Sequence, residues 1–106
     1  MTWINQDADV LLEAIVSLKN RSEAQRFLRD LLTESEIKEF AKRFKVARML
    51  NEGVSYVEIE KQTGMSSTTI ARVQKWLKDG MGGYQMMLKR MNHPAHASAF
   101  RAEGLG

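Results

Sequence analysis

The sequence contains no cysteine, and this absence excludes disulfide bonds and any metal site built on thiolates. A chain without disulfides fits a reducing compartment, so we expect a cytoplasmic protein. No apolar run approaches the roughly 20 residues that a membrane-spanning helix needs. The N-terminus also lacks the basic and then apolar layout of a signal peptide. The sequence therefore predicts no membrane partner.

Proline and histidine are scarce as well. The one proline is Pro94, and there is no stretch of alternating β-branched residues, so we expect an all-α protein. The two histidines, His93 and His96, have no carboxylate or thiolate near them in sequence, so no metal site is predicted. The chain also lacks a glycine-rich phosphate loop and a nucleophile with its base. We therefore expect neither an enzyme nor a cofactor.

Apolar residues recur at helical spacing along most of the chain and predict five to six helices in one small domain over residues 1–91. Asn20 is expected to end the first helix and Ser22 to cap the second. From residue 92 to 106 the periodicity is lost, which predicts a flexible tail. The expected helices span residues 7–19, 22–32, 33–52, 55–63, 66–78 and 84–91.

The third expected helix has two apolar sides. One stripe contains Ile37, Phe40, Ala41, Phe44 and Ala47, and a second stripe contains Val46, Met49 and Leu50 on nearly the opposite side. A helix with two apolar sides must pack on both of them, and a chain this short can scarcely cover both. We therefore expect a homodimer in which a second copy supplies one wall. The alternative is a compact monomer whose following helices fold over one stripe.

Residues 55–78 have the pattern of a helix-turn-helix. Ser55 with Glu58 forms a capping box, in which each side chain accepts a hydrogen bond from the other residue's backbone amide. Gly64 stands where the first helix must stop, because glycine takes the left-handed conformation without steric cost. Ser66 or Ser67 then starts the second helix as its N-cap. Such a second helix enters the major groove of DNA in many regulators.

The distribution of charge supports this interpretation. Residues 1–35 carry four Lys/Arg against six Asp/Glu, whereas residues 36–78 carry nine against five. A local basic surface is what contacts to phosphates require, although a solvated helix face remains the alternative. We expect hydroxyl side chains near the start of the second helix to reach base edges and basic ones to contact guanine or phosphate. The expected DNA-binding residues are Ser66, Ser67, Thr68, Thr69, Arg72, Lys75 and Lys78.

Three segments in this order, residues 32–36, 40–43 and 64–72, resemble the tryptophan repressor family, and the resemblance covers about residues 10–91. Residues 47–56, Ala-Arg-Met-Leu-Asn-Glu-Gly-Val-Ser-Tyr, are more similar to the tryptophan-repressor-like branch of bacterial proteins, the YerC/YecD type. The resemblance implies an intertwined all-α homodimer with a DNA-reading helix-turn-helix.

The family binds tryptophan between two arginines, which the resemblance places at Arg43 and Arg72. This chain departs from the family beside them, because Val73 replaces a glycine and Trp76 replaces a small serine. We expect these bulky side chains to fill the pocket, so that L-tryptophan is not the effector. Packing of Trp76 in the core beside Leu77 is the alternative. Two positions that are basic in the repressor are Val57 and Glu60 here, so its operator preference is not expected to transfer.

The sequence thus predicts a dimeric, sequence-specific regulator of transcription that binds double-stranded DNA, most simply a repressor with a near-palindromic operator. One alternative is a DNA-binding unit of the kind found in transposases or replication initiators. Another is a helical dimer that serves only as a protein-interaction module.

Overall fold

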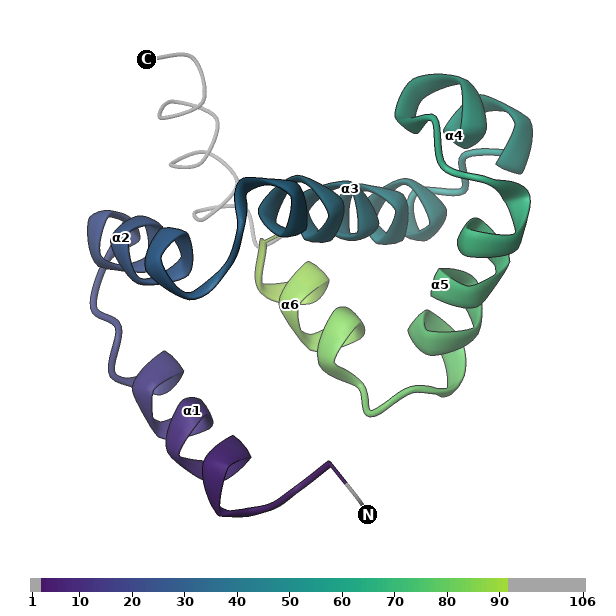
Figure 1. The fold of residues 1–106 in the computed structure, drawn as a ribbon. Helices are drawn as coiled ribbons and strands as arrows, with labels where there is room; N and C mark the ends of the chain where they lie inside the picture. Colours follow the sequence, from purple (N-terminus) through teal and green to yellow (C-terminus); the bar gives the residue numbers. More distant parts are fainter. Residues whose placement is uncertain (1–2, 92–106) are drawn as a thin grey trace. The chain divides into compact units, whose positions relative to one another are not determined.

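The computed structural model describes residues 3–91, which form six α-helices and no strand (Figure 1). The all-α prediction is therefore confirmed for this part of the chain. The predicted tail, residues 92–106 with His93 and His96, lies outside the described residues. The helices are α1 (Gln6–Val16), α2 (Arg21–Leu31), α3 (Glu34–Asn51), α4 (Tyr56–Thr63), α5 (Ser67–Asp79) and α6 (Gly83–Met91).

The boundary between the first two helices differs from the prediction. The helix α1 ends at Val16, and Asn20 is not its end but the N-cap of α2, so the prediction of a Ser22 cap is wrong. The Asn20 Oδ1 accepts a hydrogen bond from the Glu23 amide at 2.9 Å, and the Glu23 carboxylate accepts one from the Lys19 amide at 2.9 Å. The side-chain oxygen of Asn20 lies just before the helix and can accept from its free amides, whereas Ser22 already lies inside the first turn.

Capping explains where α3 and α4 begin. Before α3, the Thr33 Oγ1 accepts from the Glu36 amide at 3.1 Å and the Glu36 carboxylate accepts from the Thr33 amide at 2.9 Å, a complete capping box. Before α4, the Ser55 Oγ accepts from the Glu58 amide at 3.2 Å. The Glu58 carboxylate instead accepts from the Gln62 side chain at 2.6 Å. The Ser55 cap is confirmed, but the reciprocal half of its box is not formed.

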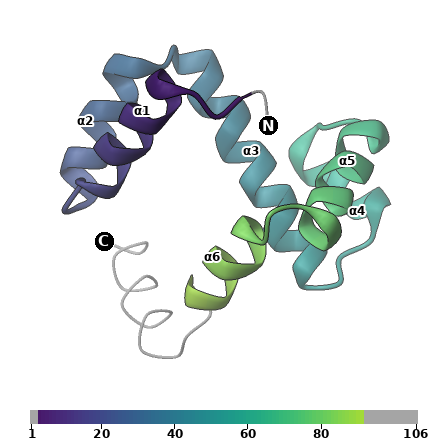
Figure 2. The ribbon, with the colours of Figure 1, turned by 90° about the horizontal axis from the view of Figure 1, so that it is seen from below.

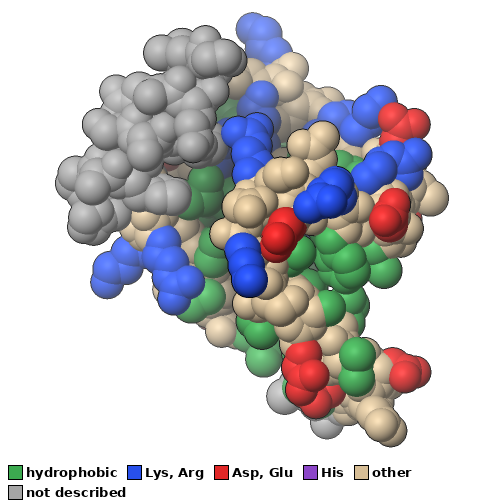
Figure 3. Space-filling view, turned by 90° about the vertical axis from the view of Figure 1, so that its left-hand side faces the viewer, with side chains coloured by type: hydrophobic (Ala, Val, Ile, Leu, Met, Phe, Trp, Pro, Cys, Tyr) green, Lys and Arg blue, Asp and Glu red, His purple; other side chains and the backbone are tan. Residues whose placement is uncertain are grey.

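The chain divides into two compact units, residues 1–39 and residues 40–106. The first unit has no buried residue among those described, and the apolar side chains of α1, such as Leu11, Leu12 and Ile15, are exposed. Figure 3 shows one face of the molecule on which hydrophobic side chains lie open to solvent. The prediction of a single domain over residues 1–91 stays a prediction.

The second unit contains the hydrophobic core. In Figures 1 and 2 the C-terminal half of α3 lies with α4, α5 and α6, and α5 packs against both α4 and α6. The α3 stripe of Val46, Met49 and Leu50 faces this core. On the other stripe Ala47 is buried as well, whereas Phe40 and Ala41 remain exposed. The core residues are Val46, Ala47, Met49, Ile59, Ile70, Val73, Leu77 and Leu88.

Candidate nucleic-acid interface

The turn between α4 and α5 depends on Gly64. Its backbone is left-handed, with φ 74° and ψ 5°, and its amide donates to the Glu60 carbonyl at 2.8 Å. A residue with a Cβ is strained in this conformation, so glycine is the natural end of α4. The helix-turn-helix predicted over residues 55–78 therefore has the expected turn at the expected residue.

A second residue of this turn was missed by the sequence analysis. The Thr63 side chain is buried, and its hydroxyl donates to the Ile59 carbonyl at 2.7 Å while it accepts from the Met65 amide at 3.2 Å. The hydroxyl thus connects the last turn of α4 to the chain that leads into α5. A threonine directly before a helix-ending glycine is the only sequence signal of this role.

Packing between α4 and α5 determines which side of α5 faces outward. Ile59 and Ile70 are fully buried, Val73 is 2% exposed, and Met65 packs partly against them. Leu77 continues the same inner face one turn further along α5. These apolar residues hold the two helices together. Since residues at helical spacing share one face, the other side of α5 is left to solvent.

The outward side of α5 is made of hydroxyl and basic side chains. Ser67 and Thr68 are exposed in its first turn, and Arg72, Lys75 and Lys78 are exposed along its length. Within residues 3–91 the only ion pair joins Arg29 to Glu34, at 3.8 Å. The three basic side chains of α5 are therefore not neutralised by carboxylates of the described chain and remain available for an anionic partner.

Ser66 and Thr69 have local hydrogen-bond partners. The Ser66 Oγ is the N-cap of α5, accepting from the Thr69 amide at 3.2 Å, and it donates to the Thr69 Oγ1 at 3.2 Å. Thr69 is also only partly exposed. These two side chains start the helix, whereas Ser67 and Thr68 are exposed beside them. The role of all seven predicted DNA-binding residues stays a prediction.

The four residues of the expected effector pocket have different surroundings, and their role stays a prediction. Arg43 is exposed, with its guanidinium carbon 5.4 Å from the centre of the Phe40 ring, and Val73 lies in the core. Trp76 is 52% exposed. The alternative prediction, that Trp76 packs in the core beside Leu77, is therefore wrong for the single chain. Trp76 lines an apolar hollow of about 450 Å³ together with Phe44, Gly80, Met81, Gly83, Tyr84 and Met87.

In residues 3–91 no group of three His, Cys, Asp or Glu side chains is placed to hold a metal ion. None of the six helices combines the length and the apolar character that crossing a membrane requires.

Comparisons with known proteins agree with the fold and with the order of its elements. The model of the Trp repressor protein family matches residues 6–92. The uncharacterised protein YerC of Bacillus subtilis (strain 168) is 45% identical over 86 residues, which cover 81% of this chain and 83% of that protein.

Two solved structures are similar as well. A TrpR-like protein from Eubacterium eligens has a TM-score of 0.78 at 40% identity, covering 82% of this chain and 90% of that one. A candidate Trp repressor from Staphylococcus aureus has a TM-score of 0.80 at 40% identity, covering 86% of this chain and 91% of that one. This chain therefore belongs to the Trp repressor protein family, in its YerC/YecD-type, TrpR-like branch.

Proposed function

We propose that this protein is a homodimeric regulator of transcription that binds a near-palindromic DNA site and represses by occupying it. Membership of the Trp repressor family points to a DNA-binding regulator in general. The observation that carries the finer proposal is the outward side of α5, where exposed hydroxyl and basic side chains stand on a helix anchored by Ile59, Ile70 and Val73. An anchored helix with a polar, cationic face suits the major groove.

Each exposed hydroxyl or basic residue of α5 then has a role. Ser67 and Thr68, together with the free amides of the first turn, contact phosphate or base edges at the floor of the groove. Arg72 and Lys75 contact guanine acceptors or phosphates, and Lys78 contacts the backbone. Two α5 helices in a dimer would lie about 34–36 Å apart, one turn of DNA, which makes a near-palindromic site the expected target.

Dimerisation would explain the apolar surface of the single chain. No apolar side chain of residues 3–39 is fully buried within the chain, although α1 and α2 each have an apolar face. On α3, the Arg48 Nε is buried and has no hydrogen-bond partner within residues 3–91. A buried donor without a partner is costly, and a second copy would supply both an acceptor and an apolar wall.

The dimer can be tested with a charge on α1. Ile15→Asp places a carboxylate on the exposed apolar face of this helix, where burial against a second copy would require its desolvation. We expect dimer affinity to fall by about 100-fold or more, measured by light scattering of chromatographed protein over a range of concentrations. The matched control is Val57→Asp on α4, which is 76% exposed and should remain dimeric. A wild-type protein that is monomeric at all concentrations contradicts the proposal.

We propose further that L-tryptophan is not the effector. Val73, which stands where the repressor has a glycine, is packed in the core. Trp76 stands on the same helix where the repressor has a small serine. Isothermal calorimetry with L-tryptophan is expected to show no binding in the micromolar range. Micromolar binding that also strengthens the affinity for DNA would overturn this part of the proposal.

One titration distinguishes a transcription regulator from the two alternative functions, a DNA-binding unit of the transposase or initiator kind and a protein-interaction module. Purified protein is titrated into labelled duplex DNA of mixed sequence while the salt concentration is raised. A surface that neutralises several phosphates loses affinity steeply with salt, whereas a protein-interaction module shows no binding to be lost. A lone DNA-binding unit of the transposase or initiator kind would bind with the same steepness but as a monomer, which light scattering detects.

A further inference from the structure

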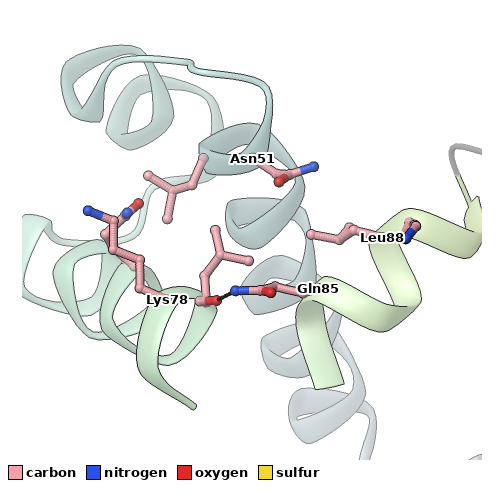
Figure 4. Close-up of a pocket in the computed structure, with 8 residues that line it drawn as sticks. Asn51, Lys78, Gln85 and Leu88 are labelled. Carbon is pink, nitrogen blue, oxygen red and sulfur yellow. Dashed lines mark hydrogen bonds between the residues drawn. The ribbon is translucent and has the colours of Figure 1, made fainter. Parts of the chain in front are cut away.

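A second hollow lies on the C-terminal unit, between α3, α5 and α6. Its volume is about 690 Å³, within the range of small-molecule sites. Figure 4 shows its wall, with Asn51 at the end of α3, Lys78 on α5, and Gln85 and Leu88 on α6. The full lining is Leu50, Asn51, Gln74, Leu77, Lys78, Gln85, Leu88 and Lys89. We call these eight residues the lysine groove.

The charged groups of the lysine groove are all positive. Lys78 and Lys89 come from two different helices, and no acidic side chain is among the lining residues. Neither lysine forms an ion pair within residues 3–91. Two ammonium groups on one hollow that has no acidic lining residue favour the binding of an anion.

The remaining lining residues divide into donors and an apolar floor. Asn51 and Gln74 carry amide groups that can donate to oxygen atoms of a ligand. Leu77 and Leu88 are buried core residues whose edges form part of the floor, and Leu50 is half-buried beside them. A ligand that satisfies both parts has an anionic group and a compact apolar body.

One hydrogen bond holds the wall together. The Gln85 Nε2 donates to the Leu77 carbonyl at 2.6 Å, a contact that joins the start of α6 to the last turn of α5 (Figure 4). The carbonyl at a helix C-terminus needs such a partner, so this bond keeps Gln85 in place. Its Oε1 atom is left as an acceptor at the edge of the groove. The hollow thus has one wall residue held by a hydrogen bond, in addition to its two exposed lysines.

We propose that the lysine groove binds a small organic anion, a phosphate or carboxylate carried on a compact apolar body. The two lysines hold the anionic group, the amides donate to it, and the leucine floor takes the apolar body. The site is distinct from the outward side of α5, except that Lys78 lies at the edge of both. It goes beyond DNA binding, and it can be tested without DNA.

The probe is phenyl phosphate, titrated into the full chain labelled with ¹⁵N and followed by NMR. We expect saturable shifts of the amides around the groove with a Kd of about 1–5 mM, as is usual for a fragment of this size. Inorganic phosphate, which lacks the apolar body, should bind about tenfold more weakly, and phenol, which lacks the charge, should not saturate. Equal affinity for phenyl phosphate and inorganic phosphate would overturn the role of the leucine floor.

Lys89→Gln is expected to weaken phenyl phosphate about fivefold or more, because one of the two charges is lost. Arg90→Gln is the matched control, since it removes the same charge from the next residue of α6, which does not line the groove, and should change the Kd less than about twofold. Asn51→Asp, which keeps both lysines but adds a carboxylate, should weaken the probe as well.

Three results would overturn the proposal. They are a lack of saturation up to about 20 mM probe, shifts that map away from the groove, and a Lys89→Gln variant that binds as the wild type does. The anion could also come from the DNA backbone. In that case Lys89→Gln would weaken DNA about fivefold while phenyl phosphate failed to bind, which rejects the small-molecule assignment. Failure of DNA binding in the wild type would leave the probe titration unaffected.

Discussion

Replacing Arg72 and Lys75 together with alanine is expected to lower the affinity for DNA by about 100- to 1000-fold. Both side chains are exposed on the outward side of α5, and each contact to guanine or phosphate contributes about 1–3 kcal/mol. The slope of affinity against salt should also become shallower, because fewer counterions are released on binding. The measurement is a titration of labelled duplex DNA at several salt concentrations.

The double variant should retain its helical content and the proposed dimer, because neither side chain lies in the core. A matched control replaces Lys19 and Arg26 with alanine, which removes the same charge from exposed positions of the first unit. We expect this control to bind DNA within about threefold of the wild type, since the general loss of positive charge is partly screened by salt. Normal retardation of DNA by the Arg72 and Lys75 variant would show that α5 is not the DNA-reading helix.

Ile70→Ala is expected to destabilise the protein by about 2–5 kcal/mol. Ile70 is fully buried between α4 and α5, and truncation removes its burial and leaves a cavity that the close-packed core fills only in part. For a chain of this size the melting temperature should fall by about 10 °C or more. Thermal unfolding followed by circular dichroism measures the effect, at one protomer concentration because a dimer's stability depends on it.

The control for Ile70 is Val57→Ala, a change of similar kind at a position that is 76% exposed on α4. Its melting temperature should stay within about 2 °C of the wild type, as is usual for surface substitutions. Ile70→Ala should also weaken DNA binding, because the inner face of α5 holds the outer face in position. An Ile70→Ala protein as stable as the wild type would contradict the assignment of the core.

The helix-turn-helix was predictable because its signals are local. Gly64 and Ser66 each act within one turn of their own position, and the inner face of α5 follows from helical spacing alone. The boundary between α1 and α2 was not predictable, because an asparagine can either end a helix or cap the start of the next one. Which role Asn20 takes depends on the Lys19 amide and the Glu23 carboxylate around it.

Other features depend on contacts that periodicity does not encode. An apolar stripe indicates that burial of this helix face is favourable, but it does not show which element buries it. The exposed apolar face of α1 is the clearest example. The same reason explains Trp76, a large apolar residue for which core packing was the alternative and which the fold leaves half exposed. The Gln85 bond to Leu77 joins residues on two helices, so neither local sequence indicates it.

Selection of bound sequences from random duplex DNA by the purified protein tests most directly whether two copies of α5 read one DNA site. We expect the recovered sequences to share a near-palindromic motif whose half-sites lie about one helical turn apart, centre to centre. Recovered DNA without a common motif, or with a single half-site and no symmetry, would contradict the claim that this chain acts as a dimeric, sequence-specific regulator.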